Sequence, residues 1–557
     1  MKQPLLSVQN LQLSFAGQPV INGISFDIFK GETFALVGES GSGKSLAALS
    51  VLRLHPAQSY LQADAIQLGD IDILRTPEAE LCQVRGQRVA MIFQDPMSSL
   101  NPVMTIGQQI AETIQIHFSL NKQQCIEKVL SLLEQVGIPD RQRRINEYPH
   151  QLSGGQRQRI MIAIALAGEP DLLIADEPTT ALDVTIQAQI LQLLKKIQQE
   201  NGMALWLISH DLALVSNMAD QVAVMQSGLI VEVAENKEIF THAKHQYTQK
   251  LLNALPDINC CAEHGKPKAD IILKLTGFKV HYPIRKGLFK RVVDYVKAVD
   301  DVSFTLEAGK TLALVGESGC GKTTLGKGLL NLIPSTAGQV EFAGVDLASL
   351  SREELREQRS AMQIVFQDPF AAMNPRMLVL DIIAEGVWAM HKDINEQDRI
   401  VIVTDLLKQV GLDETALYRY PHEFSGGQRQ RICIARALAV KPKLIVCDEP
   451  TSALDVSVQK QIIELLKSLQ KTQNISYLFI THDLAVVAEI ADEIAVMYQG
   501  KIVEHGPVNQ VLRHAQHSYT QKLLSAVPVP RLSHKKMLKT MIQSKPKLWK
   551  KDLVYGK

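Results

Sequence analysis

The sequence predicts two consecutive α/β domains of the same fold. The first observation is a short motif, 38–45, that recurs almost unchanged at 316–323; both copies fit the pattern G-x-x-x-x-G-K-[ST]. The second is that each copy follows an apolar run, 34–37 and 312–315, of the kind that forms a buried parallel strand. The third is that apolar strands alternate with amphipathic helices in each half, which is typical of α/β domains.

The two recurring motifs are phosphate-binding loops. Their glycines let backbone N–H groups surround phosphate oxygens, and the helix that follows adds the positive end of its dipole. We expect Lys44 and Lys322 to reach the β- and γ-phosphates of a nucleotide, and the hydroxyls of Ser45 and Thr323 to bind Mg²⁺. Two matches in the same strand–loop–helix context leave little room for chance. The residues expected to contact the nucleotide are Gly38, Glu39, Ser40, Gly41, Ser42, Gly43, Lys44 and Ser45 in the first loop and Gly316, Glu317, Ser318, Gly319, Cys320, Gly321, Lys322, Thr323 and Thr324 in the second.

The repeat extends along almost the whole chain. Glu177 and Glu449 are 272 residues apart, and so are His210 and His482. A period of this length indicates two duplicated domains, because solenoid repeats are far shorter. A polar seam with Pro and Gly separates them and is read as a linker. The predicted parts are a first domain at 1–255, a linker at 256–270, a second domain at 271–528 and a basic tail at 529–557. We interpret the tail as a solvated extension, with a contact to anionic lipid or to a partner as the alternative.

Within each half, the strands and helices can be followed along the sequence. Between Gln94 and Ser153 the apolar spacing becomes helical, most clearly at 126–136. A mainly helical subdomain is therefore expected inside each α/β core. The further runs that predict buried parallel strands are 172–175, 205–208, 444–447 and 477–480.

A carboxylate pair follows one of these strands in each half. Asp176 and Asp448 each end an apolar run, where a carboxylate can meet Mg²⁺ beside a phosphate loop. Glu177 and Glu449, one residue later, point to a different side and are expected to polarise the attacking water. The alternative is a mere pair of charges at a helix start, which the upstream phosphate loop disfavours.

A second anion-binding helix start occurs in each half. The segment Ser153, Gly154, Gly155 and Gln156 precedes a helical run, and Ser425, Gly426, Gly427 and Gln428 repeat it. Serine is a good N-cap, and the glycines expose backbone donors at a positive helix end. The chain thus holds four half-sites for two nucleotides, and head-to-tail pairing of the halves would close both.

Composition excludes several classes of protein. The 557 residues, 46% hydrophobic and 21% charged, suit a soluble globular chain of about three to four ordinary domains. The net charge of +1 predicts no nucleic-acid binding. None of the seven cysteines forms a C-x-x-C pair, which argues against zinc ribbons and disulfide frameworks and fits a reducing cytosol. No apolar run approaches the ~18 residues that a membrane span needs, and no signal peptide is expected.

Taken in order, these residues resemble the motif series of the ABC-transporter ATPases. In the first half the series is the phosphate loop, Gln94, 152–156, Asp176 with Glu177, 181–183 and His210; in the second half it is the phosphate loop, Gln367, 424–428, Asp448 with Glu449, 453–455 and His482. The resemblance covers the chain up to about residue 528. It implies two tandem P-loop NTPase (ABC) domains, each with a RecA-like α/β core, an antiparallel β subdomain and an inserted helical subdomain.

The resemblance also implies roles for the site residues. ATP is expected between one half's phosphate loop and the other half's signature serine. Glu177, Glu449, His210 and His482 are expected to be catalytic, the histidines through the γ-phosphate. Gln94 and Gln367 are expected to link the water and Mg²⁺ to a membrane partner, and Phe15 and Tyr282 to stack on adenine. The expected Mg²⁺ ligands are Ser45, Gln94 and Asp176 in the first half and Thr323, Gln367 and Asp448 in the second.

Departures from the family pattern are small. Phe424 replaces the usual leucine, and Ile164 stands where the other half has Arg436. Cys320 lies inside the second phosphate loop. We interpret it as a small filler, the alternative being a thiol whose alkylation blocks the loop and from which ATP protects. Both halves keep glutamate, histidine and signature, so both sites are expected to hydrolyse ATP.

Three further segments are similar to those of the dipeptide and oligopeptide importer ATPases, namely 94–102, 148–153 and 245–252. With the fusion of two halves and the segment 282–291, the chain most resembles the ATP-binding protein of microcin C/peptide importers, with the glutathione importer ATPase as the alternative. The resemblance implies two membrane-spanning permease subunits, a periplasmic peptide-binding protein and a peripheral location on the cytoplasmic face of the bacterial inner membrane. Cys260 and Cys261 are adjacent and the tail has no cysteine, so no iron–sulfur cluster is expected.

Proteins of other classes fit less well. A soluble double-ATPase translation factor would need a long, charged helical linker, and the seam at 256–270 is short and mixed. An excision-repair ATPase would need zinc-binding cysteine pairs and a basic surface. An exporter ATPase is disfavoured by the peptide-importer segments.

Overall fold

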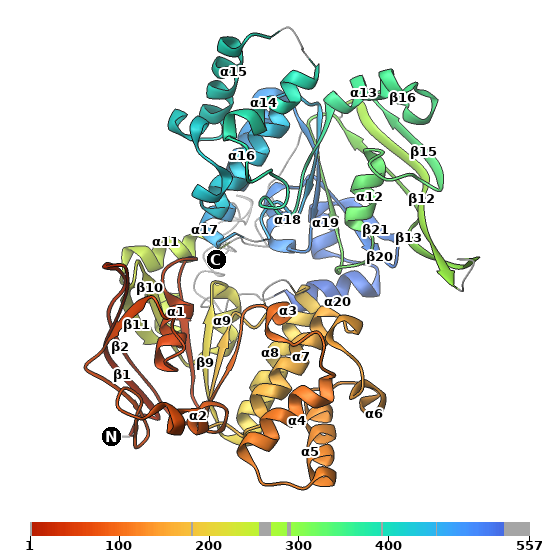
Figure 1. Cartoon of the computed structure of the whole chain (residues 1–557). Coiled ribbons are helices and arrows are strands. Elements are labelled where there is room, and N and C mark those ends of the chain that lie inside the picture. The colour runs from red at the N-terminus through yellow and green to blue at the C-terminus, as the bar shows by residue number, and fades with distance from the viewer. Residues whose placement is uncertain are drawn as a thin grey trace, which may run out of the picture. The chain divides into compact units, whose positions relative to one another are not determined.

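The structure is a computed structural model, and it describes residues 3–179, 182–255, 269–286, 291–390, 394–452 and 454–527. These residues form two compact units, one from 3–179 and 190–253 and one from 182–189 and 254–527 (Figure 1). The predicted tail, nearly all of the predicted linker, and Cys260 and Cys261 lie outside the described residues.

The core of the first unit is a six-stranded sheet in the order β11-β10-β3-β9-β8-β7. All neighbouring strands are parallel except β11, which pairs antiparallel with β10. Every residue of β3, β8 and β9 is buried, because other elements pack on both faces of the central sheet. The strands are β3 (Thr33–Val37), β7 (Val89–Ile92), β8 (Leu172–Asp176), β9 (Ala204–Ser209), β10 (Gln221–Gln226) and β11 (Leu229–Glu235).

A second, antiparallel sheet packs on this core and shares its hydrophobic cluster. Side chains of β1 and β2 alternate between buried and exposed, so only one face of this sheet meets the core. Its strands are β1 (Leu6–Phe15), β2 (Gln18–Ile28), β4 (Ser59–Gln62), β5 (Ala65–Leu68) and β6 (Ile71–Asp72).

The helical subdomain is inserted between β7 and β8. Its three long helices contact one another (Figure 1). Each begins with a capping box, in which the side chains of Thr105, Asn121 and Ser153 accept from the third helical N–H. The elements are α3 (Pro96–Ser99), α4 (Ile106–His117), α5 (Lys122–Gln135), α6 (Arg141–Arg144), η1 (Pro149–Gln151) and α7 (Gly154–Leu166). The other helices of this half are α1 (Lys44–Val51), α2 (Glu78–Gln87), α8 (Val184–Asn201), α9 (Leu212–Met218), α10 (Asn236–His242) and α11 (Gln246–Ala254).

The second unit repeats this plan. Its central sheet has the order β17-β18-β19-β14-β20-β21, and its antiparallel sheet the order β13-β12-β15-β16. The strands are β12 (Ile271–Lys286), β13 (Arg291–Glu307), β14 (Thr311–Val315), β15 (Ala337–Phe342), β16 (Val345–Asp346), β17 (Met362–Val365), β18 (Leu444–Asp448), β19 (Ser476–Thr481), β20 (Glu493–Tyr498) and β21 (Lys501–Pro507). The helices are α12 (Lys322–Leu329), η2 (Leu347–Ser349), α13 (Arg352–Ala361), α14 (Val379–Met390), α15 (Glu396–Gln409), η3 (Glu414–Tyr418), η4 (Pro421–Glu423), α16 (Gly426–Leu438), α17 (Val456–Gln473), α18 (Leu484–Ile490), α19 (Val508–Arg513) and α20 (Ser518–Ala526).

The predicted fold class is confirmed. Every run predicted as a buried parallel strand lies in one of the two central sheets, and the helical stretch at 126–136 lies in α5 and its C-cap. The phosphate loops follow β3 and β14, which are interior strands of the two central sheets. The neighbouring parallel strands end at the same edge of each sheet, where ligands of α/β sheets bind. Among the residues that the structure describes, none of the helices combines the length and apolar character of a membrane span.

Candidate functional site

The first phosphate loop is folded tightly against its own sheet. A Cβ added to Gly38 would lie 2.2 Å from the carbonyl oxygen of Met225, so only glycine fits between the loop and β10. The buried Lys44 donates from Nζ to the carbonyl oxygens of Gly38, at 2.8 Å, and Glu39, at 2.9 Å. The ammonium group therefore already lies inside the loop that phosphates are expected to enter.

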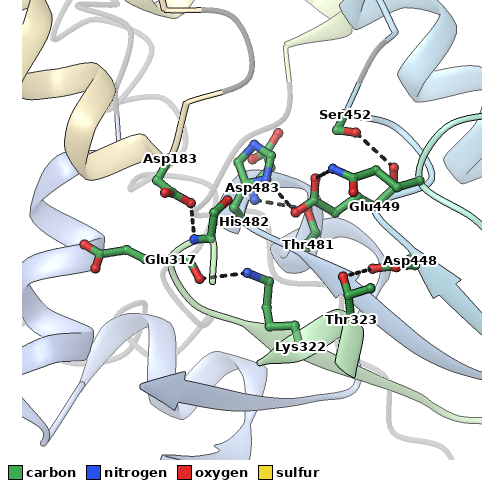
Figure 2. A network of polar contacts seen from close by, with 12 residues as sticks. Asp183, Glu317, Lys322, Thr323, Asp448, Glu449, Ser452, Thr481, His482 and Asp483 are labelled. Carbon is green, nitrogen blue, oxygen red and sulfur yellow. Dashed lines mark hydrogen bonds and ion pairs between the residues drawn. The ribbon is translucent and has the colours of Figure 1, made fainter. Parts of the chain in front are cut away.

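The second phosphate loop has the same geometry. A Cβ on Gly316 would lie 2.2 Å from the carbonyl oxygen of Met497. Lys322 donates from Nζ to the carbonyl oxygen of Gly316, at 2.7 Å. It also donates to the carbonyl oxygen of Glu317, at 3.1 Å (Figure 2). The two nearly identical loops thus fold alike, each between a buried strand and a helix N-terminus.

A hydroxyl and a buried carboxylate meet beside each loop. Ser45 Oγ donates to Asp176 Oδ1 at 2.9 Å, and Thr323 Oγ1 donates to Asp448 Oδ1 at 2.9 Å (Figure 2). Burial raises the pKa of Asp176 to about 6 and also raises that of Asp448, against the opposing effect of the hydroxyl hydrogen bonds. Burial therefore makes the charged form of each carboxylate costly, and the nearby lysines offset only part of that cost.

These oxygen donors fit a hard divalent cation such as Mg²⁺. Mg²⁺ is commonly bound by one or two protein oxygens together with phosphate and water, and the residues present match that pattern. Within the described part of the chain, no group of three or more His, Cys, Asp or Glu side chains could hold a metal without such help.

Glu177 is held by two side chains from separate elements. Gln94 Nε2 donates to Glu177 Oε2 at 2.8 Å, and His210 Nδ1 lies 3.0 Å from Glu177 Oε1. The backbone of Glu177 has a φ of 46°, in the left-handed region, and its N–H donates to Ile208 of β9. A non-glycine residue in this region carries a backbone strain that is typical of functional sites.

Glu449 repeats this arrangement in the second unit. Gln367 Nε2 donates to Glu449 Oε2 at 2.8 Å, and His482 Nδ1 lies 3.3 Å from Glu449 Oε1 (Figure 2). Burial alone would raise the pKa of Glu449, but the hydrogen bond and charge of His482 lower it overall. The pKa of His482 is raised, because Glu449 outweighs its burial. The two shifts favour the ionised form of Glu449 and the protonated form of His482.

The serine-glycine segments have the local structure expected of them. Ser153 is the N-cap of α7 and Ser425 the N-cap of α16, each in a capping box with the glutamine three residues later. Their anion-binding role, and the pairing of each with the other half's phosphate loop, stay predictions.

Comparison with known proteins agrees with this geometry. Residues 21–180 and 299–452 match the family described as ABC transporter, and residues 231–271 and 503–552 match the oligopeptide/dipeptide transporter C-terminal region. The peptidoglycan transport ATP-binding protein YejF of Agrobacterium fabrum is 48% identical over 94% of this chain and 96% of its own length. The uncharacterized ABC transporter ATP-binding protein YejF of Escherichia coli K12 is 47% identical, over 94% of this chain and 100% of its own length. The glutathione import ATP-binding protein GsiA of the same strain is 45% identical, over 97% of this chain and 92% of its own length.

The chain belongs to the ABC transporter family. It carries two tandem ABC domains, which bind ATP and hydrolyse it, followed in each half by the oligopeptide/dipeptide transporter region.

The aromatic residues predicted for adenine lie in corresponding strands of the two ABC domains. Phe15 ends β1 and is half-buried against the core, whereas Tyr282 lies in β12 and is 44% exposed. Stacking of adenine on either ring stays a prediction.

Cys320 takes the place of Ser42 in the second ABC domain. Ser42 Oγ lies 3.5 Å from Lys44 Nζ, and Cys320 Sγ lies 4.0 Å from Lys322 Nζ. Burial raises the pKa of the Cys320 thiol despite the nearby ammonium. A buried, protonated thiol favours the interpretation of a small filler.

Sequence reasoning missed one pair of contacts to the ABC phosphate loops. The hydroxyls of Tyr247 and Tyr519 lie against the backbone of Glu39 and Glu317. Both tyrosines belong to a segment that occurs twice, at 245–252 and 517–524, and whose first copy was noted above only for its resemblance to the peptide-importer ATPases. The two tyrosines lie 272 residues apart, the same offset as the repeated glutamates and histidines, but no sequence signal named their partners.

Proposed function

We propose that this chain is the ATP-hydrolysing subunit of an importer for peptides, of the microcin C and oligopeptide type. The oligopeptide/dipeptide transporter region in both halves supports a peptide cargo. One relative is named for peptidoglycan transport and another for glutathione import, and both of these cargoes contain peptide. An importer for glutathione is the alternative, because that relative is nearly as similar.

The proposed mechanism assigns one task to each group of residues. Lys44 and Lys322 leave their loop carbonyls and hold the β- and γ-phosphates of ATP. Glu177 and Glu449 orient and polarise the attacking water, each fixed by its histidine and glutamine. The serines that cap α7 and α16 complete the two nucleotide sites.

Mg²⁺, when bound, would neutralise charge that develops on the phosphates. Ser45 and Asp176 in the first half, and Thr323 and Asp448 in the second, would hold it. Gln94 and Gln367 are proposed as further ligands through their amide oxygens, because their amide nitrogens donate to the glutamates.

The proposed assembly contains two membrane-spanning permease subunits and a periplasmic peptide-binding protein. This chain would lie at the cytoplasmic face of the bacterial inner membrane, with its domains at 1–255 and 271–528 acting as the two ATPases. ATP binding would draw these domains together, the permeases would change access, and hydrolysis would reset them.

One observation carries this proposal: both halves hold a glutamate between a glutamine and a histidine. We expect Glu177→Gln, and equally Glu449→Gln, to reduce ATP hydrolysis by about 10²-fold or more, since loss of a general base costs roughly 10²–10⁴-fold. Steady-state turnover of the purified chain measures this. Matched controls are Glu80→Gln and Glu353→Gln, exposed helix residues that lose the same charge.

The outcomes separate three mechanisms. Near-complete loss in each single variant supports two coupled, competent sites. If one variant is silent and the other inactive, the two sites are not equivalent. If both variants and the double variant match the wild type, these glutamates are not the catalytic bases.

The cargo is tested in the assembled transporter. The chain, its permeases and the binding protein are reconstituted in liposomes, and ATP hydrolysis is followed with a microcin C-type peptide, with di- and oligopeptides and with glutathione. Stimulation by the peptides supports the proposal, and stimulation by glutathione alone supports the alternative.

A further inference from the structure

The recurring segments at 245–252 and 517–524 have no part in the mechanism above, yet each reaches a phosphate loop. Tyr247 Oη accepts a hydrogen bond from the backbone N–H of Glu39 at 3.2 Å. In the second unit, Tyr519 Oη accepts from the backbone N–H of Glu317 at 2.9 Å. Both tyrosines are buried. Because the contact occurs in both domains, we regard it as part of the domain fold.

The tyrosine and the loop lysine hold opposite ends of one peptide group. In the first loop this is the peptide that joins Gly38 to Glu39. Its carbonyl oxygen accepts from Lys44 Nζ at 2.8 Å, and its N–H donates to Tyr247.

The second loop shows the same double hold on the peptide between Gly316 and Glu317. Lys322 Nζ donates to its carbonyl oxygen at 2.7 Å, and Tyr519 accepts from its N–H. A peptide fixed at both ends keeps one orientation, which sets the course of the loop that follows.

Each tyrosine is itself fixed by the strand next to its helix. Glu232 of β11 accepts from the backbone N–H groups of Lys244, at 2.7 Å, and His245, at 3.1 Å. His245 Nδ1 in turn accepts from the N–H of Tyr247 at 3.2 Å. The hydroxyl is therefore presented to the loop from a preorganised helix start.

The second unit fixes Tyr519 in the same way. Glu504 of β21 accepts from the N–H groups of Gln516, at 2.7 Å, and His517, at 3.1 Å. His517 Nδ1 accepts from the N–H of Tyr519 at 3.2 Å. The ring of Tyr519 also packs on Tyr498 of β20, with centroids 4.2 Å apart.

We propose that Tyr247 and Tyr519 are positioning residues that hold the first peptide of each phosphate loop while the loop lysine moves to the nucleotide. Once Lys44 or Lys322 turns to phosphate, that peptide loses its carbonyl partner. The tyrosine then keeps the peptide in place, so the loop's remaining N–H groups stay aimed at phosphate. The hydroxyls thereby set the affinity for ATP. This rests on the assignment of the phosphate loops as the ATP sites.

The test removes only the hydroxyl. Tyr519→Phe and Tyr247→Phe keep the buried rings, and we expect each to raise the KM and the Kd for ATP at its site about threefold to tenfold, the range that one net hydrogen bond gives. The kcat should stay within about twofold. Tyr498→Phe is the matched control, because its ring touches Tyr519 but its hydroxyl accepts from Gln499. Its ATP affinity should equal that of the wild type.

A second measurement does not depend on turnover. Hydrogen–deuterium exchange of the peptides that contain Glu39 and Glu317 should become faster in the matching phenylalanine variant, with ATP present, and unchanged in Tyr498→Phe. Unchanged exchange and unchanged ATP affinity in Tyr519→Phe would overturn the proposal. So would a lower thermal midpoint at unchanged ATP affinity, which is what a purely structural tyrosine predicts.

Failure of the underlying ATP-site assignment looks different. Lys322→Ala and Lys44→Ala should abolish binding of a fluorescent ATP analogue at their sites. If the lysine variants bind it normally, the loops are not the ATP sites. If they fail to bind while the tyrosine variants bind as the wild type does, only the role of the tyrosines is wrong.

Discussion

In each half, a single glutamate, Glu232 or Glu504, fixes the start of a helix by accepting backbone hydrogen bonds. Burial by itself would raise the pKa of Glu504, but the hydrogen bonds from the N–H groups of Gln516 and His517 lower it overall. Glu232 does the same in the first half, with Lys244 and His245 as backbone donors. Neither role could be read from the sequence, because each glutamate is 12 or 13 residues from its backbone partners.

The sign of the pH dependence follows from that lowered pKa. A carboxylate whose folded pKa is below its unfolded value stabilises the fold above the unfolded pKa, and this contribution is lost as pH falls through the folded value. We expect Glu504→Gln to lower the thermal midpoint at pH 7, with a difference from the wild type that shrinks below pH ~4.5 as the native carboxylate protonates.

Thermal unfolding from pH 3.5 to 8 measures this difference. Glu414→Gln, an exposed residue of η3, is the control and should show no such trend. A difference that stays constant or grows toward acid pH would mean that Glu504 acts through its shape and not its charge.

At the scale of elements, the two halves differ at one contact. The contact joins the helix that begins at the serine-glycine segment, α7 or α16, to the segment that follows Gln94 or Gln367. Arg436 of α16 donates from Nη1 to the carbonyl oxygen of Ala372 at 2.6 Å. The first half has Ile164 at the corresponding position and has no guanidinium there to make such a bond. In the second half, the segment that follows Gln367 is therefore held by a charged hydrogen bond that Ile164 cannot supply at the corresponding position of the first half.

We expect Arg436→Leu to destabilise the second domain by about 1.5–3 kcal/mol, the usual worth of a hydrogen bond to a charged group. Urea unfolding followed through a domain-specific probe measures it. The reverse change, Ile164→Arg, should not stabilise the first domain by a comparable amount, since burial of a guanidinium without a prepared acceptor is unfavourable. Equal stability of Arg436→Leu and wild type would show that the bond contributes nothing net.

The elements that sequence reasoning found are those with a strong apolar period. The strands of the central sheets are buried on both faces and appear as continuous runs such as 205–208. The antiparallel sheet was expected only from the family resemblance, because β4 and β6 are short and carry no clear alternation. The long hairpin of β12 and β13 was also missed as such, since its outer part around Tyr282 and Tyr295 is exposed and mixes basic with apolar residues.

The same distinction applies to the candidate site. Lys44, Asp176 and Glu177 were predicted because their chemistry is tied to fixed positions after strands and loops. The left-handed backbone of Glu177, and its hold by Gln94 and His210, depend on how strands distant in sequence end beside one another. Tertiary contacts of that kind are absent from a single sequence.

For the whole molecule, the duplication places two nearly identical sites in one chain but puts a thiol in only one of them. Cys320 is buried, and its raised pKa makes it a slow nucleophile, whereas Cys82 on α2 is exposed. Among the two phosphate loops, only the second can therefore be modified by a thiol reagent. Modification of Cys320 tests whether the first site can hydrolyse ATP when the second site is blocked.

N-ethylmaleimide tests the alternative to the small-filler interpretation: if the reagent reaches the buried Cys320, ATP hydrolysis by the wild-type chain should fall in proportion to modification of Cys320, after Cys82 has reacted. A maleimide adduct would crowd Lys322, 4.0 Å away, and exclude phosphate from that loop. If hydrolysis needs both sites, turnover falls by far more than half. ATP should slow inactivation, because bound phosphates cover the loop.

Cys320→Ser recreates the first loop's residue and should keep full activity while resisting the reagent; Cys82→Ser should remain sensitive. Mass spectrometry of the digested chain assigns the modified residue, and residual turnover is compared with its occupancy. A residual activity of about one half at full modification of Cys320 would mean that the two domains hydrolyse ATP independently. Coupling between hydrolysis at the two sites would then have to arise from the membrane partners, since the two domains of the chain would act independently.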